Sequence, residues 1–278
     1  MSPLEFVLSL FAIAFAAGFL GSLVGLGGGI IIVPVLTLLY GIDIRYAIGA
    51  SIVSVIATSS GAAAAYVREG MTNLRAAMFL EIGTTTGAIS GAFLAGVIPK
   101  EWLSLIFGLV LAYSVFAMLR HKRDRNAPVP SDVWADWLLL HGSYLDKQTG
   151  EEVHYRVTHT KLGLLLMYIA GAVSGLLGIG SGVLKVTAMD LAMRLPIKVS
   201  TATSNFMIGV TAAASAGVYF ARGDINPFIA APVAVGVLFG ATVGALLLPK
   251  ISSRWLRIVF IGVLLVVAAQ MIWKGLHR

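Results

Sequence analysis

The sequence predicts an all-α membrane protein, a polytopic bundle of transmembrane helices that consists of two five-segment repeats. Of its 278 residues, 58% are hydrophobic and only 12% are charged, whereas a soluble domain carries about 25% charged residues. The apolar residues form long uncharged runs such as residues 8–40, and a membrane span needs about 20 of them. The two halves of the chain also match each other at one constant offset, so one helical unit is present twice.

The membrane spans are expected to be α-helices, because a helix satisfies its own backbone hydrogen bonds in lipid. The period-2 alternation of a membrane barrel is absent. The first span, residues 4–24, has no basic segment before it and is interpreted as a retained helix rather than a signal peptide. The absence of cysteine excludes disulfides and thiolate metal sites. The net charge of +7 is explained by basic loops at an anionic lipid surface, so no nucleic-acid partner is expected.

The repeat is clearest in two glycine motifs, where residues 23–29 align with residues 176–182 at an offset of 153. A single offset that holds over about eighty residues is hard to obtain by chance, so the repeat predicts the architecture. The further matched pairs are Val33 and Val186, Arg45 and Lys198, Ser51 and Ser204, Tyr66 and Tyr219, Asn73 and Asn226, Gly87 and Gly240, and Trp102 and Trp255.

We expect residues 1–119 to form the first transmembrane repeat, residues 120–160 a cytoplasmic loop, and residues 161–278 the second transmembrane repeat. The second hydrophobic segment of each repeat is short and follows a glycine cluster, a pattern typical of discontinuous helices at the midplane of a transporter. The expected segments are 4–24, 29–40, 46–67, 75–97 and 102–119 in the first repeat, and 161–178, 182–193, 199–220, 227–248 and 255–273 in the second.

The distribution of basic residues favours inverted repeats. If all ten segments cross the membrane, Lys and Arg concentrate beside the central loop and both termini lie outside. If the short segments turn back instead, four crossings per half produce parallel repeats with a weaker charge bias. Both arrangements place the central loop in the cytoplasm. Within it we expect a short interfacial helix over residues 134–140 and a β-hairpin over residues 143–157, which act either as a tether or as a regulatory or dimer contact; a homodimer is left open.

The two glycine motifs are the first candidates for substrate binding. Glycine exposes backbone N–H groups, and N–H groups at the start of a helix attract anions. Two such sites that face each other would suit an anion carried through lipid, whereas the alternative is close packing of helices. The candidate residues are Gly27, Gly28 and Gly29 in the first repeat, and Gly180, Ser181 and Gly182 in the second.

Polar side chains within the expected spans are the second group of candidates. Ser51, Thr203, Ser204 and Asn205 lie near the repeat-matched position, where hydroxyls and amides bind either substrate oxygens or neighbouring helices.

Two charged residues complete the candidate site. Glu81 is an intramembrane carboxylate with no neighbouring cation in its own segment and is a candidate proton carrier; the alternative is a hydrated position near the interface. Lys185 follows the second glycine motif, where the first repeat has Ile32. It either supplies positive charge to an anion or extends to a lipid headgroup.

The sequence contains no set of residues that suits an enzyme. All five histidines lie in expected loops or at the tail, so no expected span offers a haem ligand pair, a metal site or a catalytic histidine. We therefore expect neither catalysis nor a cofactor.

Residues 21–34, which read Gly-Ser-Leu-Val-Gly-Leu-Gly-Gly-Gly-Ile-Ile-Ile-Val-Pro, resemble the TauE/SafE sulfite exporter family. Residues 47–51 (Ala-Ile-Gly-Ala-Ser) and the second glycine motif fit the same pattern, and the likeness covers nearly the whole chain outside the central loop. The resemblance implies a multi-pass permease of the bacterial inner membrane. Its substrate would be sulfite or a small organosulfonate anion such as sulfoacetate, and export driven by the proton gradient is the expected direction.

The second motif departs from the first at three positions, with Ser181, Lys185 and Thr187 in place of Gly, Ile and Pro. The second half-site is therefore chemically distinct, and the substrate can differ from sulfite. An uptake permease for another oxyanion such as thiosulfate and a passive anion channel are the alternatives.

Overall fold

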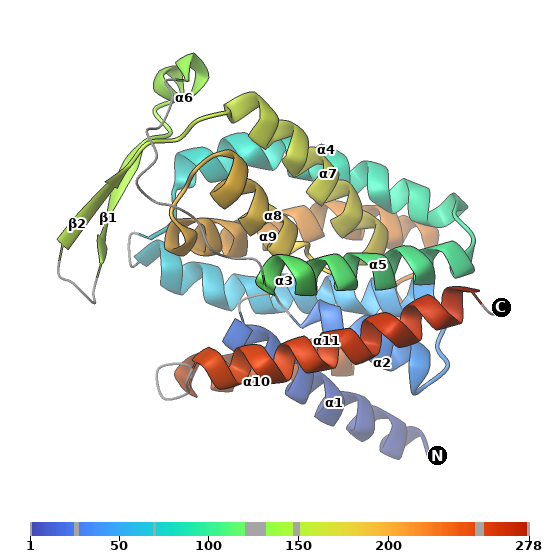
Figure 1. The fold of residues 1–278 in the computed structure, drawn as a ribbon. Coiled ribbons are helices and arrows are strands. Elements are labelled where there is room, and N and C mark those ends of the chain that lie inside the picture. The colour runs from blue at the N-terminus through green and yellow to red at the C-terminus, as the bar shows by residue number, and fades with distance from the viewer. Residues whose placement is uncertain are drawn as a thin grey trace.

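The computed structural model describes residues 2–24, 28–68, 71–119, 132–146, 151–247 and 253–276, and it is a bundle of long helices with one small hairpin (Figure 1). The first half contains α1 (Pro3–Val24), α2 (Gly29–Leu38), α3 (Ile44–Arg68), α4 (Leu74–Val97) and α5 (Lys100–Leu119). The connecting region contains α6 (Val133–Trp137), β1 (Gly142–Asp146) and β2 (Glu151–Tyr155). The second half contains α7 (Thr160–Leu177), α8 (Gly182–Thr187), the π-helix η1 (Ala188–Ala192), α9 (Ile197–Arg222), α10 (Pro227–Leu247) and α11 (Ser253–Leu276).

Within the described ranges, five helices are long and apolar enough to cross a membrane, judged by length and composition: α1, α4, α5, α7 and α10. The helices α3 and α9 are equally long but carry hydroxyl side chains along part of their length. The chain is therefore an all-α membrane protein.

Local signals in the sequence explain where several helices begin and end. Asn73 caps α4, because its side-chain oxygen accepts a hydrogen bond from the backbone N–H of Ala76 at 3.0 Å. Gly178 ends α7 and Gly223 ends α9, and both adopt the left-handed conformation, with φ of 66° and 79°. Glycine is favoured there because it has no Cβ to clash with the preceding turn.

The first two helices form a hairpin. Tyr40, which follows α2, donates a hydrogen bond of 2.8 Å to Ser9 near the start of α1, and its ring lies edge-on against Phe6. The ten residues of α2 extend only about 15 Å, which is half the thickness of the hydrocarbon core. The chain therefore lies near the starting end of α1 again soon after α2 ends.

The corresponding segment of the second half returns in the same way. The backbone N–H of Thr158, just before α7, donates to the carbonyl of Met193, just after η1, at 3.1 Å. The helix α8 and the π-helix η1 together thus run back along α7 to the end of the bundle where α7 begins.

The long helices pack in pairs that join the two halves: α1 against α10, α4 against α7, α3 against α9, and α5 against α11. Glycine permits the close approach of these backbones. A Cβ added at Gly87 of α4 would lie 2.1 Å from the carbonyl oxygen of Tyr168 in α7, and one added at Gly240 of α10 would lie 2.0 Å from that of Phe15 in α1. The two contacts are related by the repeat: the offset of 153 relates Gly87 to Gly240 and Phe15 to Tyr168.

Figure 1 shows both chain ends at one end of the bundle, with α6 and the β1–β2 hairpin at the opposite end. The strands are antiparallel, with Gly142 opposite Tyr155 and Asp146 opposite Glu151.

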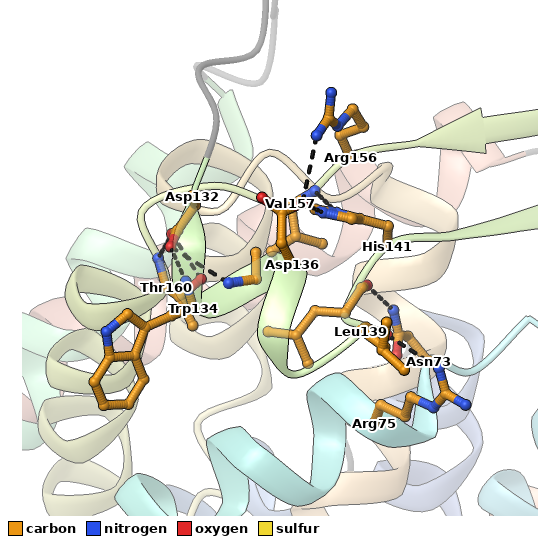
Figure 2. A network of polar contacts seen from close by, with 12 residues as sticks. Asn73, Arg75, Asp132, Trp134, Asp136, Leu139, His141, Arg156, Val157 and Thr160 are labelled. Atoms are coloured by element: carbon orange, nitrogen blue, oxygen red, sulfur yellow. Dashed lines mark hydrogen bonds and ion pairs between the residues drawn. The ribbon is translucent and has the colours of Figure 1, made fainter.

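The connecting region is hydrogen-bonded to the helices beneath it (Figure 2). Asp132 accepts hydrogen bonds from the backbone N–H of Thr160, at 2.6 Å, and from its hydroxyl, at 2.7 Å. The amide of Asn73 donates to Leu140 O at 2.7 Å and to the Tyr155 hydroxyl at 3.0 Å. The region is thereby fastened to the starts of α7 and α4.

Candidate functional site

The second glycine motif is a tight turn between α7 and α8. Its backbone adopts left-handed conformations at Gly178, Gly180 and Ser181, with φ of 66°, 70° and 45°. Glycine adopts left-handed backbone conformations without strain, whereas the same conformation is strained for Ser181, which has a Cβ. The turn reverses the chain within four residues, so that α8 begins at Gly182 in the interior of the bundle. In the first motif Gly28 and Gly29 begin α2, and Gly27 lies outside the described residues.

The two glycine motifs touch each other. Ser51 of α3 donates a hydrogen bond of 2.6 Å to the carbonyl oxygen of Gly178. A Cβ added at Gly29 would lie 2.6 Å from the Ser51 hydroxyl oxygen and 3.0 Å from the same carbonyl. The start of α2 thus contacts the end of α7, and any side chain at position 29 would separate them.

The hydroxyl and amide candidates of α9 do not all face this contact. Ser204, which the repeat aligns with Ser51, donates to the carbonyl oxygen of Gly182 at 3.4 Å. The Thr203 hydroxyl instead accepts a hydrogen bond of 3.1 Å from the backbone N–H of Asn73, at the start of α4. Asn205 is buried within α9. Ser51 and Ser204 therefore bind the glycine motifs, whereas Thr203 binds the start of α4 instead.

The structure joins the two charged candidates through a residue that the sequence analysis missed. The ammonium of Lys185 on α8 donates to the Thr211 hydroxyl of α9 at 2.7 Å. That hydroxyl lies 2.8 Å from Oε1 of Glu81 on α4 and can donate to it. Thr85 also donates to Oε1, at 3.1 Å. Lys185 and Glu81 form no direct ion pair, so Thr211 is the link between them.

This network is enclosed within the bundle. Lys185 and Thr211 are 0% exposed and Glu81 is 8% exposed. The ammonium of Lys185 therefore does not extend to a lipid headgroup. A buried charge is stable only when an opposite charge or several hydrogen bonds compensate it, and Glu81, acting through Thr211, provides part of that compensation.

Several polar atoms near the network lack partners. Glu81 Oε2 and the Ser181 hydroxyl are buried and make no hydrogen bond with the described residues. The Lys185 ammonium has three donors, and one of them is used by Thr211. Because buried polar groups are normally hydrogen-bonded, these atoms are suited to a polar ligand. The free donors of Lys185 and Ser181 suit the oxygens of an anion, and Glu81 Oε2 can hold a proton.

The charged network, which joins both halves, is not repeated at the positions related to it by the offset. Subtracting the repeat offset of 153 from Lys185 and Thr211 leads to Ile32 and Thr58, and adding it to Glu81 leads to Ala234. The alignment of Thr211 with Thr58 is the signal by which the sequence could have identified Thr211. Since the first motif is followed by Ile32, the packing of a short helix after a glycine motif does not require a lysine.

The described residues contain no group of three or more His, Asp or Glu side chains that could hold a metal ion. Lys185 and Ser181, which have free donors, suit an anion rather than a cation.

Comparison with known proteins places the chain in a family. The family model described as sulfite exporter TauE/SafE matches residues 10–271. The probable membrane transporter protein YunE of Bacillus subtilis is 28% identical over 268 residues, which cover 94% of this chain and 95% of that protein. A probable membrane transporter protein of Xylella fastidiosa is 29% identical, with 95% of this chain and 92% of that protein covered.

The likeness extends to an archaeal protein. A probable membrane transporter protein of Methanocaldococcus jannaschii is 25% identical, with coverage of 92% of this chain and 91% of that protein. No solved structure is significantly similar to the chain. The family match confirms the resemblance that the glycine motif indicated, and the chain belongs to the sulfite exporter TauE/SafE family of membrane transporters.

Proposed function

We propose that this protein is a secondary transporter that exports sulfite or a small organosulfonate anion, such as sulfoacetate, across the cytoplasmic membrane. The observation that carries the proposal is the ammonium of Lys185, which is fully buried beside the second glycine motif and has donors to spare. A cation in this position attracts an anion of matching size, and the name of the matching family supplies the chemical class of that anion.

In this proposal the anion lies next to the contact between the two glycine motifs. Its oxygens accept hydrogen bonds from Lys185 and from the Ser181 hydroxyl, both of which have unused donors. Backbone N–H groups of the two glycine motifs complete the site. Ser51 and Ser204 hold the motifs in place through the Gly178 and Gly182 carbonyls, so they position the site rather than contribute charge.

We further infer that the two repeats are inverted and that the central loop faces the cytoplasm. Three features support this: the helix pairs that join the halves, the glycine contacts that recur at the repeat offset, and the position of both chain ends opposite the β1–β2 hairpin (Figure 1). Movement of one repeat against the other would expose the site to each side of the membrane in turn.

The proposal is tested by thermal denaturation of the detergent-purified protein in the presence of single anions. A ligand that binds the folded state alone raises the apparent melting temperature. The panel contains sulfite, thiosulfate, sulfoacetate, methanesulfonate, taurine, sulfate, phosphate and acetate. We expect sulfite or a sulfonate to stabilise the protein, and the double variant Lys185→Ile with Glu81→Ala to abolish this effect. Ser54→Ala is the control, because the Ser54 hydroxyl bonds only within its own helix.

The outcomes separate the alternatives. Stabilisation by thiosulfate alone would favour an uptake permease for that oxyanion. Counterflow of labelled sulfite in proteoliposomes distinguishes a transporter from a channel, because a channel cannot accumulate label against its gradient. If no anion in the panel stabilises the protein, the proposed function is wrong and the glycine motifs serve packing.

A further inference from the structure

The link between Lys185 and Glu81 determines which ion accompanies the anion. We propose that anion binding at Lys185 and protonation of Glu81 occur together, with Thr211 as the positioning residue that couples them. The protein would then carry a monoanion such as hydrogensulfite together with a proton as an electroneutral pair, and in the proposed export the outward gradient of the anion, rather than the inward gradient of protons, would drive both. This inference rests on the proposed function and adds to it the coupled ion, the sign of the coupling and the residue responsible.

Thr211 is at a branch point of the hydrogen-bond network. Its hydroxyl has one proton and two acceptors at 2.8 Å, namely Glu81 Oε1 and the carbonyl oxygen of Met207. The same oxygen accepts the hydrogen bond from Lys185 at 2.7 Å. When Glu81 is ionised, the carboxylate is the stronger acceptor. When Glu81 is protonated, the Thr211 proton turns to Met207 and the hydrogen bond from Lys185 remains.

Charge balance requires the two binding events to be linked. With Lys185 protonated and Glu81 ionised, the site carries no net charge. A monoanion that binds alone leaves one uncompensated negative charge in the interior, which is strongly unfavourable at low dielectric. A proton that binds Glu81 alone leaves one uncompensated positive charge. Binding of both restores neutrality, and the proton adds to Oε2, the buried carboxylate oxygen without a partner.

By thermodynamic reciprocity, the anion must raise the proton affinity of the site by the same factor by which the proton raises the affinity for the anion. The pair can cross the low-dielectric interior without a net charge, so its transport does not respond to the membrane potential.

Other ionisable groups near Glu81 are engaged elsewhere. The helix α4 packs against α7 and α9. On α7, Lys161 lies over the ring of Trp134 and Tyr168 donates to Ser90. On α9, Arg222 donates to the Ala92 carbonyl near the far end of α4.

Among the ionisable residues that remain on the packed elements, one could accept the proton in place of Glu81. The further ionisable residues on the packed elements are Arg75 on α4, Asp190 on η1, and Lys198 and Tyr219 on α9. Of these, Asp190 is the second buried carboxylate in the described part of the chain, so it is tested separately.

The experiment is calorimetric titration of methanesulfonate into the full-length protein in detergent. Methanesulfonate is a monoanion without a titratable group, so any proton taken up belongs to the protein. Titrations at one pH in buffers of different ionisation enthalpy measure the number of protons bound per anion. We expect uptake of up to one proton, and an affinity that falls by up to about tenfold for each pH unit over the range in which Glu81 loses its proton.

Four variants assign the roles. Glu81→Gln is expected to bind methanesulfonate with an affinity independent of pH and without proton uptake. Thr211→Val should weaken the dependence of affinity on pH at least several-fold. Thr85→Val is the matched control, because the Thr85 hydroxyl also reaches Glu81 but lies outside the link to Lys185. Asp190→Asn should retain the proton uptake of the unmodified protein.

The possible results are distinct. If no anion binds the unmodified protein, the proposed function and this inference are both wrong. If methanesulfonate binds without proton uptake, only this inference is overturned. Proton uptake that persists in Glu81→Gln, or that is lost in Asp190→Asn, assigns the proton to a group other than Glu81. Either result overturns this inference as well. Equal pH dependence in Thr211→Val and Thr85→Val rejects the role of Thr211. If Thr211→Val does not fold, Thr211→Ser provides a second test, because serine keeps the hydroxyl. Thr211→Ser must show the pH dependence of the unmodified protein if Thr211 couples the two binding events.

Discussion

Ser51 of α3 donates a 2.6 Å hydrogen bond to the carbonyl oxygen of Gly178, at the end of α7. A residue of the first half thus holds the glycine motif of the second half in place. The same hydroxyl lies against Gly29, so one serine is in contact with both motifs. The stability of the turn that begins α8 should therefore depend on a side chain that is distant from it in sequence.

The first prediction concerns this hydrogen bond. Ser51→Ala leaves the buried Gly178 carbonyl without the Ser51 donor, and we expect a loss of about 1–3 kcal/mol of stability. Thermal denaturation of the purified protein measures it. Ser54→Ala is the matched control, since this equally buried hydroxyl donates only to the Ser51 carbonyl of its own helix. Equal losses in both variants would contradict the prediction.

The second prediction concerns the buried charges. Lys185→Ile or Glu81→Ala alone leaves an uncompensated charge in the interior, which costs about 3–5 kcal/mol when the partner remains charged. The double variant introduces the residue types found at the repeat-matched positions, Ile32 and Ala234. It should therefore be more stable than either single variant, and a double-mutant cycle of melting temperatures measures the coupling. Additive losses would show that the two charges do not interact.

The third prediction concerns the close contact of α4 with α7. A Cβ added at Gly175 would lie only 1.9 Å from the Ala88 carbonyl oxygen, so Gly175→Ala must push the helices apart and should cost at least about 1–3 kcal/mol. Gly217→Ala in α9 is the control, because a Cβ there meets nothing within 4 Å. It should change the melting temperature little or raise it slightly. A well-tolerated Gly175→Ala would contradict the packing of these helices.

The fourth prediction concerns Asp132, which caps α6 and binds the start of α7. Partial burial opposes its ionisation, but hydrogen bonds from the Thr160 backbone and hydroxyl and from the backbone of Trp134 and Ala135 outweigh this and lower the pKa of the carboxyl below its ordinary value of 3.8. Asp132→Ala should destabilise α6 by about 1–2 kcal/mol. Faster proteolysis between α5 and α7 and altered tryptophan fluorescence would report it.

The pH dependence of this contact has a defined sign. Because the folded state lowers the pKa of Asp132, its stabilisation is fully present above the ordinary value of 3.8 and is lost as the pH falls below it. Asp136→Ala is the control, since the Asp136 carboxylate bonds His141 and Arg156 at the surface, where ion pairs contribute little. A proteolysis rate that does not rise in acid would count against the cap.

The helices follow the expected hydrophobic segments closely, including the two short ones. The segment 29–40 becomes α2 at Gly29–Leu38, and the segment 182–193 becomes α8 followed by the π-helix η1. Such boundaries are readable because apolar length, glycine ends and caps are encoded by neighbouring residues. The π-helical turn of η1 was not expected, since apolar length and glycine ends do not distinguish a π-helix from an α-helix.

The side chains that meet across helices were harder to predict. Thr203 and Ser204 are adjacent in sequence, yet only Ser204 reaches the glycine motif while Thr203 contacts Asn73. One residue along an α-helix turns the side chain by about 100°, so a shift of a single position selects a different partner. Glu81 was interpreted without a neighbouring cation because the residues beside it in its own helix offer none, and Arg75 lies six positions away.

The sequence alone therefore determined the membrane class, the helical segments, the broken helices after the glycine motifs and the family. These properties depend on apolar length, turn chemistry and motif spacing, which are local along the chain. Only the tertiary structure decided that Lys185 and Glu81 meet at Thr211. That contact joins α8, α4 and α9, and it depends on the rotation and depth at which these helices pack, which no single segment encodes.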